Sequence, residues 1–251
     1  ALLLLALLLT LTQLFMVHAQ SDIDHDGISD VKEVELAQLY APCLQFKAGE
    51  RFFPVDIDYH ITNSVLKFRS GEEVSVVDPS PTVATLSTYT EEYYFLDNKL
   101  GGMVEIAEDY SQKRSSLGYT VYAHVTRDTN YIVIQYWFFY AYNDATLNQH
   151  EGDWEMIEVL LDNFENPVSA VYSQHMRGQR SSWVDVDKTD GTHPIVYVAK
   201  GSHANYFRLY QGSLGLENDE VGADGLYLTS SAFHLIILGE HGSGNHPPSQ
   251  D

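Results

Sequence analysis

Alternating apolar and polar positions run through the middle and end of the chain and predict β-strands. The clearest pair is 117–126 and the aromatic run 131–142, which a polar turn joins into an expected hairpin. Further strands are predicted at 154–161, 168–175, 194–199 and 232–238. Consecutive strands joined by short turns pair antiparallel, so the pattern favours a mainly β fold, an antiparallel β-sandwich with peripheral short helices.

Helical spacing is confined to the edges of this pattern. One helix is expected from about Asp30 to the residues before Pro42, with Ser29 or Asp30 as its N-cap. Two more short helices are expected, one after the turn at 78–82 and one across 103–113. The segment 46–63 leaves two alternatives open: a short helix that begins at Pro54, or a strand in which Val55 and every second residue share a face.

The chain begins with a leucine-rich apolar segment. Residues 1–19 end in the small-x-small pattern Val17-His-Ala19, which is typical of a secretory signal peptide and predicts cleavage after Ala19. The apolar run of about 16 residues is short for a membrane span. The expected location is therefore secreted or extracellular, with an uncleaved membrane anchor as the alternative. The predicted division is a signal peptide at 1–19, a calcium-binding loop and short helix at 20–38, and one β-sandwich domain at 39–251, whose polar tail at 241–251 suits a longer protein.

The composition narrows the classes of partner. With 35 Asp and Glu against 14 Lys and Arg, the net charge of −21 repels nucleic acid and anionic lipid headgroups. Nucleic-acid binding is therefore not expected, and peripheral membrane contact would need a bound cation. The single cysteine, Cys43, forms no intrachain disulfide and is expected to be a buried small apolar residue.

Residues 22–33 have the spacing of a twelve-residue calcium loop, with Gly27 at the sixth position for the sharp turn. The predicted Ca²⁺ ligands are Asp22, Asp24, Asp26, the backbone carbonyl of Ile28, Asp30 and Glu33. The alternative is a solvated acidic linker. After cleavage, only Gln20 and Ser21 precede the loop, so no entering helix is present to be moved. The loop resembles those of thrombospondin type 3 and dockerin repeats, and a structural role is expected.

A His-x-x-Asp-x-Glu motif directly follows the aromatic strand. In an extended backbone Asp153 and Glu155 point to the same face, and His150 and Asp144, in the loop before them, can reach it. Clustered carboxylates repel one another unless a cation or proton intervenes, so these four residues predict a second metal site for Ca²⁺ or Mg²⁺. The alternative is a buried acid pair hydrogen-bonded to backbone and tyrosines.

Two other histidines stand where strands end. His175 closes the predicted strand 168–175, and His203 follows the strand 194–199. Loop residues at strand ends are common site residues. Both histidines are therefore candidates for lining the same pocket as His150.

Several segments together resemble a known family. They are Gln135-Tyr-Trp-Phe-Phe-Tyr140, His150–Glu155, Ser173-Gln-His175, His193–Tyr206 and the stretch from Tyr40-Ala-Pro to Phe53-Pro54. This combination is similar to the vacuolar protein sorting-associated protein 62 family, over roughly residues 39 to 240. The molecular activity of that family is poorly defined, so the resemblance implies a fold more than a chemistry.

The motif His150-Glu-Gly-Asp-Trp-Glu155 also resembles, more distantly, the Gly-His-Arg-His-Asp-Trp-Glu motif of necrosis-inducing cytolysins. That resemblance implies a secreted β-sandwich with a divalent cation that engages sugar headgroups of sphingolipids. Carried over by position, His150, Asp153 and Glu155 would be metal ligands and Asp144 the loop carboxylate. Glu151 and Gly152 stand where that family has Arg and His, so toxicity and the lipid target are not implied.

The predicted function is a secreted metal-dependent binding protein that recognises glycan or lipid headgroups, because a bound cation with open positions can chelate sugar hydroxyls or a phosphate. The alternative is a metal-dependent hydrolase in which His175 or His203 acts as general base. A third hypothesis is a purely structural component with incidental ions. The sequence contains no nucleophile elbow, phosphate loop or zinc-protease helix motif, so an enzyme is disfavoured.

Overall fold

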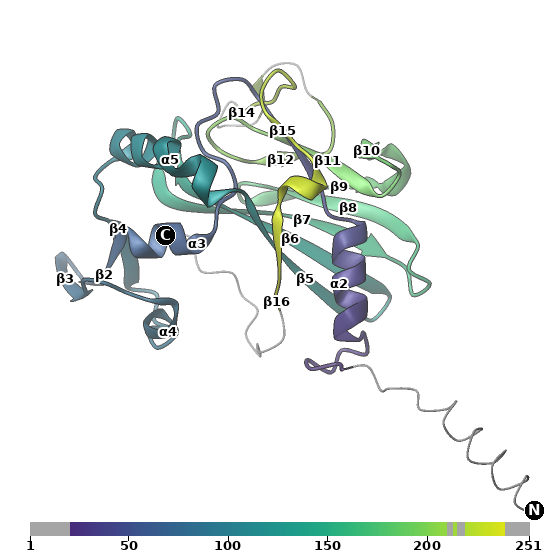
Figure 1. The fold of residues 1–251 in the computed structure, drawn as a ribbon, viewed down its shortest axis with the longest axis horizontal. Coiled ribbons are helices and arrows are strands. Elements are labelled where there is room, and N and C mark those ends of the chain that lie inside the picture. The colour runs from purple at the N-terminus through teal and green to yellow at the C-terminus, as the bar shows by residue number, and fades with distance from the viewer. Residues whose placement is uncertain (1–20, 210–212, 215–218, 239–251) are drawn as a thin grey trace, which may run out of the picture.

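The computed structural model of the chain describes residues 21–209, 213–214 and 219–238 (Figure 1). The predicted signal peptide at 1–19 and the polar tail at 241–251 lie outside the described residues. Within them, no helix combines the length and the apolar character that crossing a bilayer requires.

A six-stranded sheet with the order β16-β5-β6-β7-β8-β9 forms the centre of the fold. Its strands are β5 (Thr120–Asp128), β6 (Tyr131–Asn143), β7 (His150–Leu161), β8 (Pro167–Gln174), β9 (Arg177–Ser182) and β16 (His234–Leu238). The pairs from β5 to β8 are antiparallel, as the short turns predicted, and β9, which was not predicted, also pairs antiparallel with β8. β16 instead lies parallel to β5, at the other edge of the sheet from β9 (Figure 1).

The start of β7 corrects the sequence interpretation. The motif histidine His150 was expected in the loop before the strand, but β7 begins at His150 itself. The reason is the length of β6, which runs to Asn143 and pairs that residue with His150. The motif therefore lies within the antiparallel β6–β7 ladder, which Gly152 interrupts with a φ of +66°.

A second sheet has the order β10-β11-β1-β15, with β12 paired to β11. Its strands are β1 (Cys43–Phe46), β10 (Lys188–Thr189), β11 (His193–Val198), β12 (Asn205–Tyr206) and β15 (Tyr227–Leu228). Apolar side chains of both sheets share one core, in which Leu44 and Val196 join Tyr136 and Ile157. The fold is mainly β and consistent with the predicted sandwich. The pairing of β1 with β11 is parallel and was not predicted.

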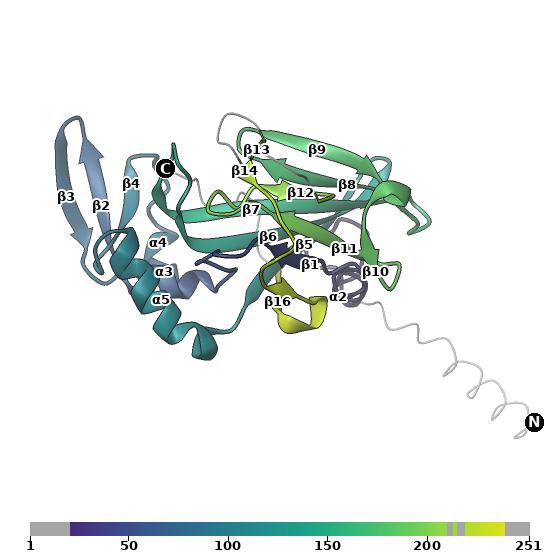
Figure 2. The ribbon, with the colours of Figure 1, turned by 90° about the horizontal axis from the view of Figure 1, so that it is seen from above.

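The remaining elements lie around these sheets. They are α3 (Ile57–Thr62), α4 (Val83–Leu86), α5 (Met103–Leu117), the sheet of β2 (Ser64–Ser70), β3 (Glu73–Asp78) and β4 (Tyr94–Asn98), the pair β13 (Ser213–Leu214) and β14 (Asp219–Glu220), and the 3-10 turns η1 (Trp183–Asp185) and η2 (Ser230–Ala232). The helix α3, capped by Asp56, decides the alternative left open at 46–63. Figures 1 and 2 place the β2–β4 sheet at the end of the molecule opposite α2.

The helix α2 (Asp30–Leu39) confirms the helix expected before Pro42. Ser29 is its N-cap and accepts a hydrogen bond from the backbone N–H of Lys32. Ala37 is fully buried against the central sheet, and the Tyr136 hydroxyl donates to its carbonyl at 2.8 Å. The helix therefore shares the core of the sandwich.

Candidate functional site

The Asp153 and Glu155 side chains lie on the inner face of β7, as the two-residue period of a strand predicted. Only 2% of Asp153 and 7% of Glu155 is exposed. Across the ladder Asp153 faces Tyr140 and Glu155 faces Phe138, both of which are fully buried. The two acids therefore sit at one end of the core and need partners there.

The partner of Asp153 is His203, in the turn between β11 and β12. Its backbone φ is +56°, and its side chain is fully buried with the ring stacked on Tyr140 at 3.8 Å between centroids. Nδ1 of His203 donates to Oδ2 of Asp153 at 2.7 Å. Nε2, on the other side of the ring, lies 3.6 Å from Oε1 of Glu50. The imidazole thus stands between two buried carboxylates.

This arrangement favours a charged imidazolium. Burial alone would lower the pKa of His203, but the hydrogen bond to Asp153 and the carboxylate of Glu50 raise it from 6.5 to about 10. Burial alone would raise the pKa of Glu50. The His203 imidazolium and the backbone N–H groups of Phe52 and Gly201 have a larger, opposite effect, and lower this pKa to about 2. At neutral pH the positive charge required by this cluster is carried by His203.

The environment of Glu155 favours the neutral, protonated form of its carboxyl group. Its burial and then the neighbouring charge of Asp153 raise its pKa well above the ordinary value of 4.5, although the Ser173 hydroxyl donates a hydrogen bond to its carboxylate. Burial and like charge both disfavour its ionised form. The two acids of one motif, two residues apart, therefore have different surroundings: Asp153 accepts a hydrogen bond from the His203 ring, and Glu155 accepts one from the Ser173 hydroxyl.

The remaining two residues of the predicted second metal site have partners of their own. Nε2 of His150 is 4.0 Å from Oδ1 of Asp153, while its Nδ1 bonds to the carbonyl of Gly152 at 2.9 Å. Asp144 forms an ion pair with Arg51 and accepts from Gln149. In this arrangement the four predicted ligands do not gather around one point. The cation predicted here stays a prediction, and His203 supplies the positive charge that the motif demanded.

A polar cleft of about 220 Å³ opens beside this buried cluster. The loop after β6 and the turn after β11 form two of its walls, and backbone contact holds them together, since the N–H of Asp144 donates to the carbonyl of Gly201 at 2.8 Å. A Cβ at Gly201 would lie 2.9 Å from the Asp144 carbonyl oxygen, so this approach requires glycine. The lining residues are Asp144, Ala145, Thr146, Lys200, Gly201, Ser202, Asp219 and Glu220.

His175 and His203 lie next to residues that line this cleft. Nε2 of His175 lies 2.8 Å from Oδ2 of Asp219, a lining residue that also accepts from Ser202 and Tyr206 at 2.6 Å each. His203 belongs to the same turn as the lining residues Gly201 and Ser202, but its own side chain is fully buried. Neither histidine lines the cleft, and nor does His150.

Three participants escaped the sequence analysis: Glu50, Arg51 and Asp219. Glu50 accepts three backbone hydrogen bonds, from Arg51, Phe52 and Gly201, and thereby fixes the β11–β12 turn. Glu50 and Arg51 lie within the stretch from Tyr40 to Pro54 that carries the family resemblance, but no spacing there marked them as site residues, and none of the three stands at the end of a predicted strand. Only the folded chain brings them together.

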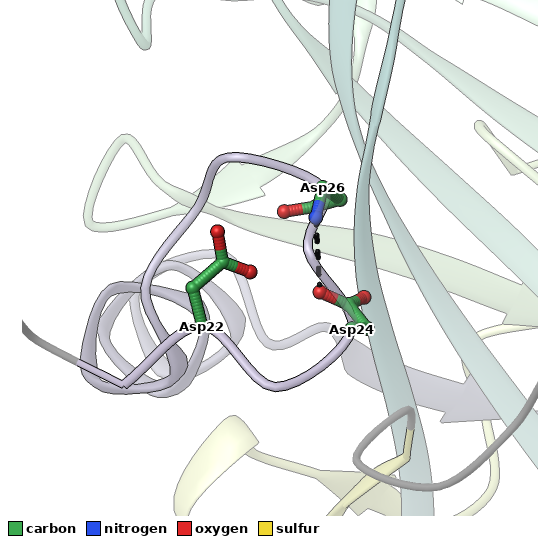
Figure 3. Close-up of side chains that lie close together, drawn as sticks. All are labelled: Asp22, Asp24 and Asp26. Atoms are coloured by element: carbon green, nitrogen blue, oxygen red, sulfur yellow. Dashed lines mark hydrogen bonds between the residues drawn. The ribbon is translucent and has the colours of Figure 1, made fainter.

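The N-terminal loop brings together three of its predicted ligands. The carboxylates of Asp22, Asp24 and Asp26 each offer an oxygen within 4.8 Å of the others and lie around the inside of one loop (Figure 3). Among the described residues, this set is the one group of three or more potential metal ligands gathered so closely. Asp30 instead accepts a hydrogen bond from the N–H of Ile23 and closes the loop.

Comparison with known proteins yields one family and a set of distant structures. The family model for vacuolar protein sorting-associated protein 62 matches residues 20–245. No curated protein matches the chain. Among solved structures, "Toxin fold for microbial attack and plant defense" is 20% identical with a TM-score of 0.43, covering 87% of this chain and 82% of that chain. "NLPPya in complex with glucosamine" is 20% identical with a TM-score of 0.41, covering 87% and 76%. The non-toxic HaNLP3 protein is 16% identical with a TM-score of 0.42, covering 85% and 81%. Scores below 0.5 at this identity do not assign a ligand or an activity.

Proposed function

This chain belongs to the vacuolar protein sorting-associated protein 62 family, and from that premise we propose that it binds glycans or the sugar headgroups of lipids in the cleft beside Asp144. The observation that carries the proposal is the chemistry of the cleft lining. The residues that line it include three with carboxylates (Asp144, Asp219 and Glu220), two with hydroxyls (Thr146 and Ser202) and one with an ammonium group (Lys200). Such a surface accepts hydrogen bonds from ligand hydroxyl or amino groups.

The charge of the lining also selects among ligands. An excess of carboxylates, on a chain with a net charge of −21, favours neutral or cationic groups and disfavours phosphate or sulfate. A sugar or amino sugar therefore fits better than an anionic headgroup.

The walls of the cleft are held in place before any ligand arrives. Glu50 fixes the backbone of Gly201, His203 is locked between Glu50 and Asp153, and Asp144 is paired with Arg51. A preformed site avoids the entropy loss of ordering loops on binding. This supports a binding role in which the buried ion pairs act as a scaffold.

The cation-dependent form of this function also requires the four predicted metal ligands to rearrange. For Asp144, His150, Asp153 and Glu155 to hold Ca²⁺ or Mg²⁺ together, their side chains must move closer to one another, and the cation must compete with Arg51 for Asp144 and with His203 for Asp153. A bound cation would then supply a Lewis acid that chelates ligand hydroxyls. Binding measured with EDTA and with each divalent cation distinguishes the two forms.

One observation favours a second candidate, hydrolysis. His175 is partly exposed, with 33% of its side chain accessible, and its ring is oriented by the buried carboxylate of Asp219 beside the cleft. A histidine held in this way can serve as a general base. His203 cannot, because it is fully buried and both of its ring nitrogens face carboxylates.

A glycan array followed by calorimetry on the purified chain tests the proposal. Glu220→Gln should weaken binding about tenfold or more, because it replaces a charged acceptor by a neutral amide, and Thr146→Ala up to about tenfold, because it removes a hydroxyl from the lining. Glu108→Gln, on the exposed face of α5, is the matched control and should bind like the wild type. Absence of any glycan ligand, or equal affinity of all variants, would refute the proposal. Release of a product that His175→Ala abolishes would favour hydrolysis.

A further inference from the structure

The N-terminal loop lies apart from the proposed binding cleft and has a separate chemistry. Its three gathered carboxylates, of Asp22, Asp24 and Asp26, are held in place by backbone hydrogen bonds. The N–H of Gly27 donates to Oδ2 of Asp22 at 3.1 Å. The N–H of Asp26 donates to Oδ1 of Asp24 at 3.3 Å (Figure 3). Gly27 has a φ of +89°, which glycine adopts readily and which lets the loop turn back on itself.

A fourth carboxylate faces this group from the first turn of α2. Glu33 is 94% buried, and its Oε1 accepts no hydrogen bond from the described part of the chain. Oδ1 of Asp22 is also buried without a partner. The carboxylates of Asp24, Asp26, Asp30 and Asp22 lie close enough to repel a charge on Glu33. A buried carboxylate with an orphaned oxygen beside three others is unfavourable unless a cation joins it.

No side chain supplies that cation within the described residues. The ion pairs formed there by Lys and Arg include none with Asp22, Asp24, Asp26 or Glu33. Lys32, beside Glu33 in sequence, instead pairs with Glu165 at 2.8 Å. This is the opposite of the buried site on β7, where His203 provides the charge.

We infer that this loop is a Ca²⁺ site in which Glu33 is a direct ligand with Asp22, Asp24 and Asp26, and that the bound ion fastens α2 to the central sheet. Hard oxygen ligands in this number suit calcium, which takes six to eight of them in flexible geometry, better than magnesium. The spacing of the sequence assigns a further oxygen to the carbonyl of Ile28.

The coupling to the sheet follows from what the ligands touch. Oδ2 of Asp26 accepts from the N–H of Arg127, at the end of β5, at 2.7 Å. Glu33 belongs to α2, and the loop between them carries Ile28, whose side chain is 96% buried in the core. One ion shared by Asp26 and Glu33 would therefore tie the helix to the strand through the loop.

The test is a comparison of calcium binding and thermal unfolding in the purified chain after treatment with EGTA. The wild type should bind one Ca²⁺ at this loop, and calcium a hundredfold above Kd should raise its melting temperature by about 5–10 °C. Glu33→Gln should lose at least about tenfold in calcium affinity. Glu35→Gln, on the same helix with 64% of its side chain exposed, is the control and should behave as the wild type.

Glu33→Gln also distinguishes a weakened response to calcium from misfolding. In EGTA, Glu33→Gln should melt at the same temperature as the wild type or higher, because an amide is easier to bury than a carboxylate beside three others. Hydrogen exchange should show α2 amides protected by calcium in the wild type. The inference is overturned if calcium neither binds nor raises the melting temperature, if Glu33→Gln responds to calcium like the wild type, or if calcium leaves α2 exchange unchanged.

Discussion

Replacing Asp153 by asparagine perturbs the buried ion pair while keeping the shape of the side chain. Oδ2 of Asp153 accepts from His203 at 2.7 Å, and both side chains are at most 2% exposed, so solvent does not screen the pair. The raised pKa of His203, about 10 against 6.5, corresponds to about 5 kcal/mol. Asp153 and Glu50 share that stabilisation. Removing one charge should therefore lower the free energy of unfolding by about 3 kcal/mol.

Glu155→Gln is the matched variant on the same strand face. Because the raised pKa of Glu155 favours the protonated acid, a neutral amide of similar shape should change the free energy of unfolding by less than about 1 kcal/mol. The measurement is urea unfolding at pH 7, with EDTA and with millimolar calcium. An equal loss in both variants that depends on the divalent cation would refute the imidazolium argument and support a metal at the motif.

Three further predictions concern the same region. Raising the pH from 7 to 10 should lower the free energy of unfolding. The reason is that the raised pKa of His203 contributes stability that is fully present below pH 6.5 and is lost as the pH passes about 10. Urea titrations of the wild type at several pH values measure this loss, and His203→Gln should flatten the pH profile. Gly201→Ala should destabilise the fold by about 2–3 kcal/mol and abolish binding in the cleft, because φ is +79° and the new Cβ would meet the Asp144 carbonyl. Thermal melts and calorimetry measure both effects, and a variant that melts and binds like the wild type would contradict this prediction. Arg51→Ala should cost less than about 1 kcal/mol in urea unfolding, because 45% of the Arg51 side chain is exposed, and a larger loss would mean that its pair with Asp144 supports the fold.

Local patterns were sufficient for much of the sandwich. Strands β5 to β8 and the helix α2 follow from periodicity, from short turns and from the cap at Ser29, and each depends on residues close in sequence. The strand β9, the β2–β4 sheet and the two parallel pairs were missed. The parallel partners β1 and β11 are about 150 residues apart, and no local signal encodes their contact.

The candidate site divides in the same way. That Asp153 and Glu155 share a face follows from the two-residue period of any strand, and the demand for a positive charge follows from their proximity. What meets the demand was decided by tertiary structure. The turn after β11 carries His203 across 50 residues to Asp153, and the burial of its ring between Asp153 and Glu50 makes it a cation. At the N-terminal loop, by contrast, the spacing is local, so the sequence by itself predicts calcium there. The fold added a buried oxygen of Glu33 that has no hydrogen-bond partner within the described part of the chain.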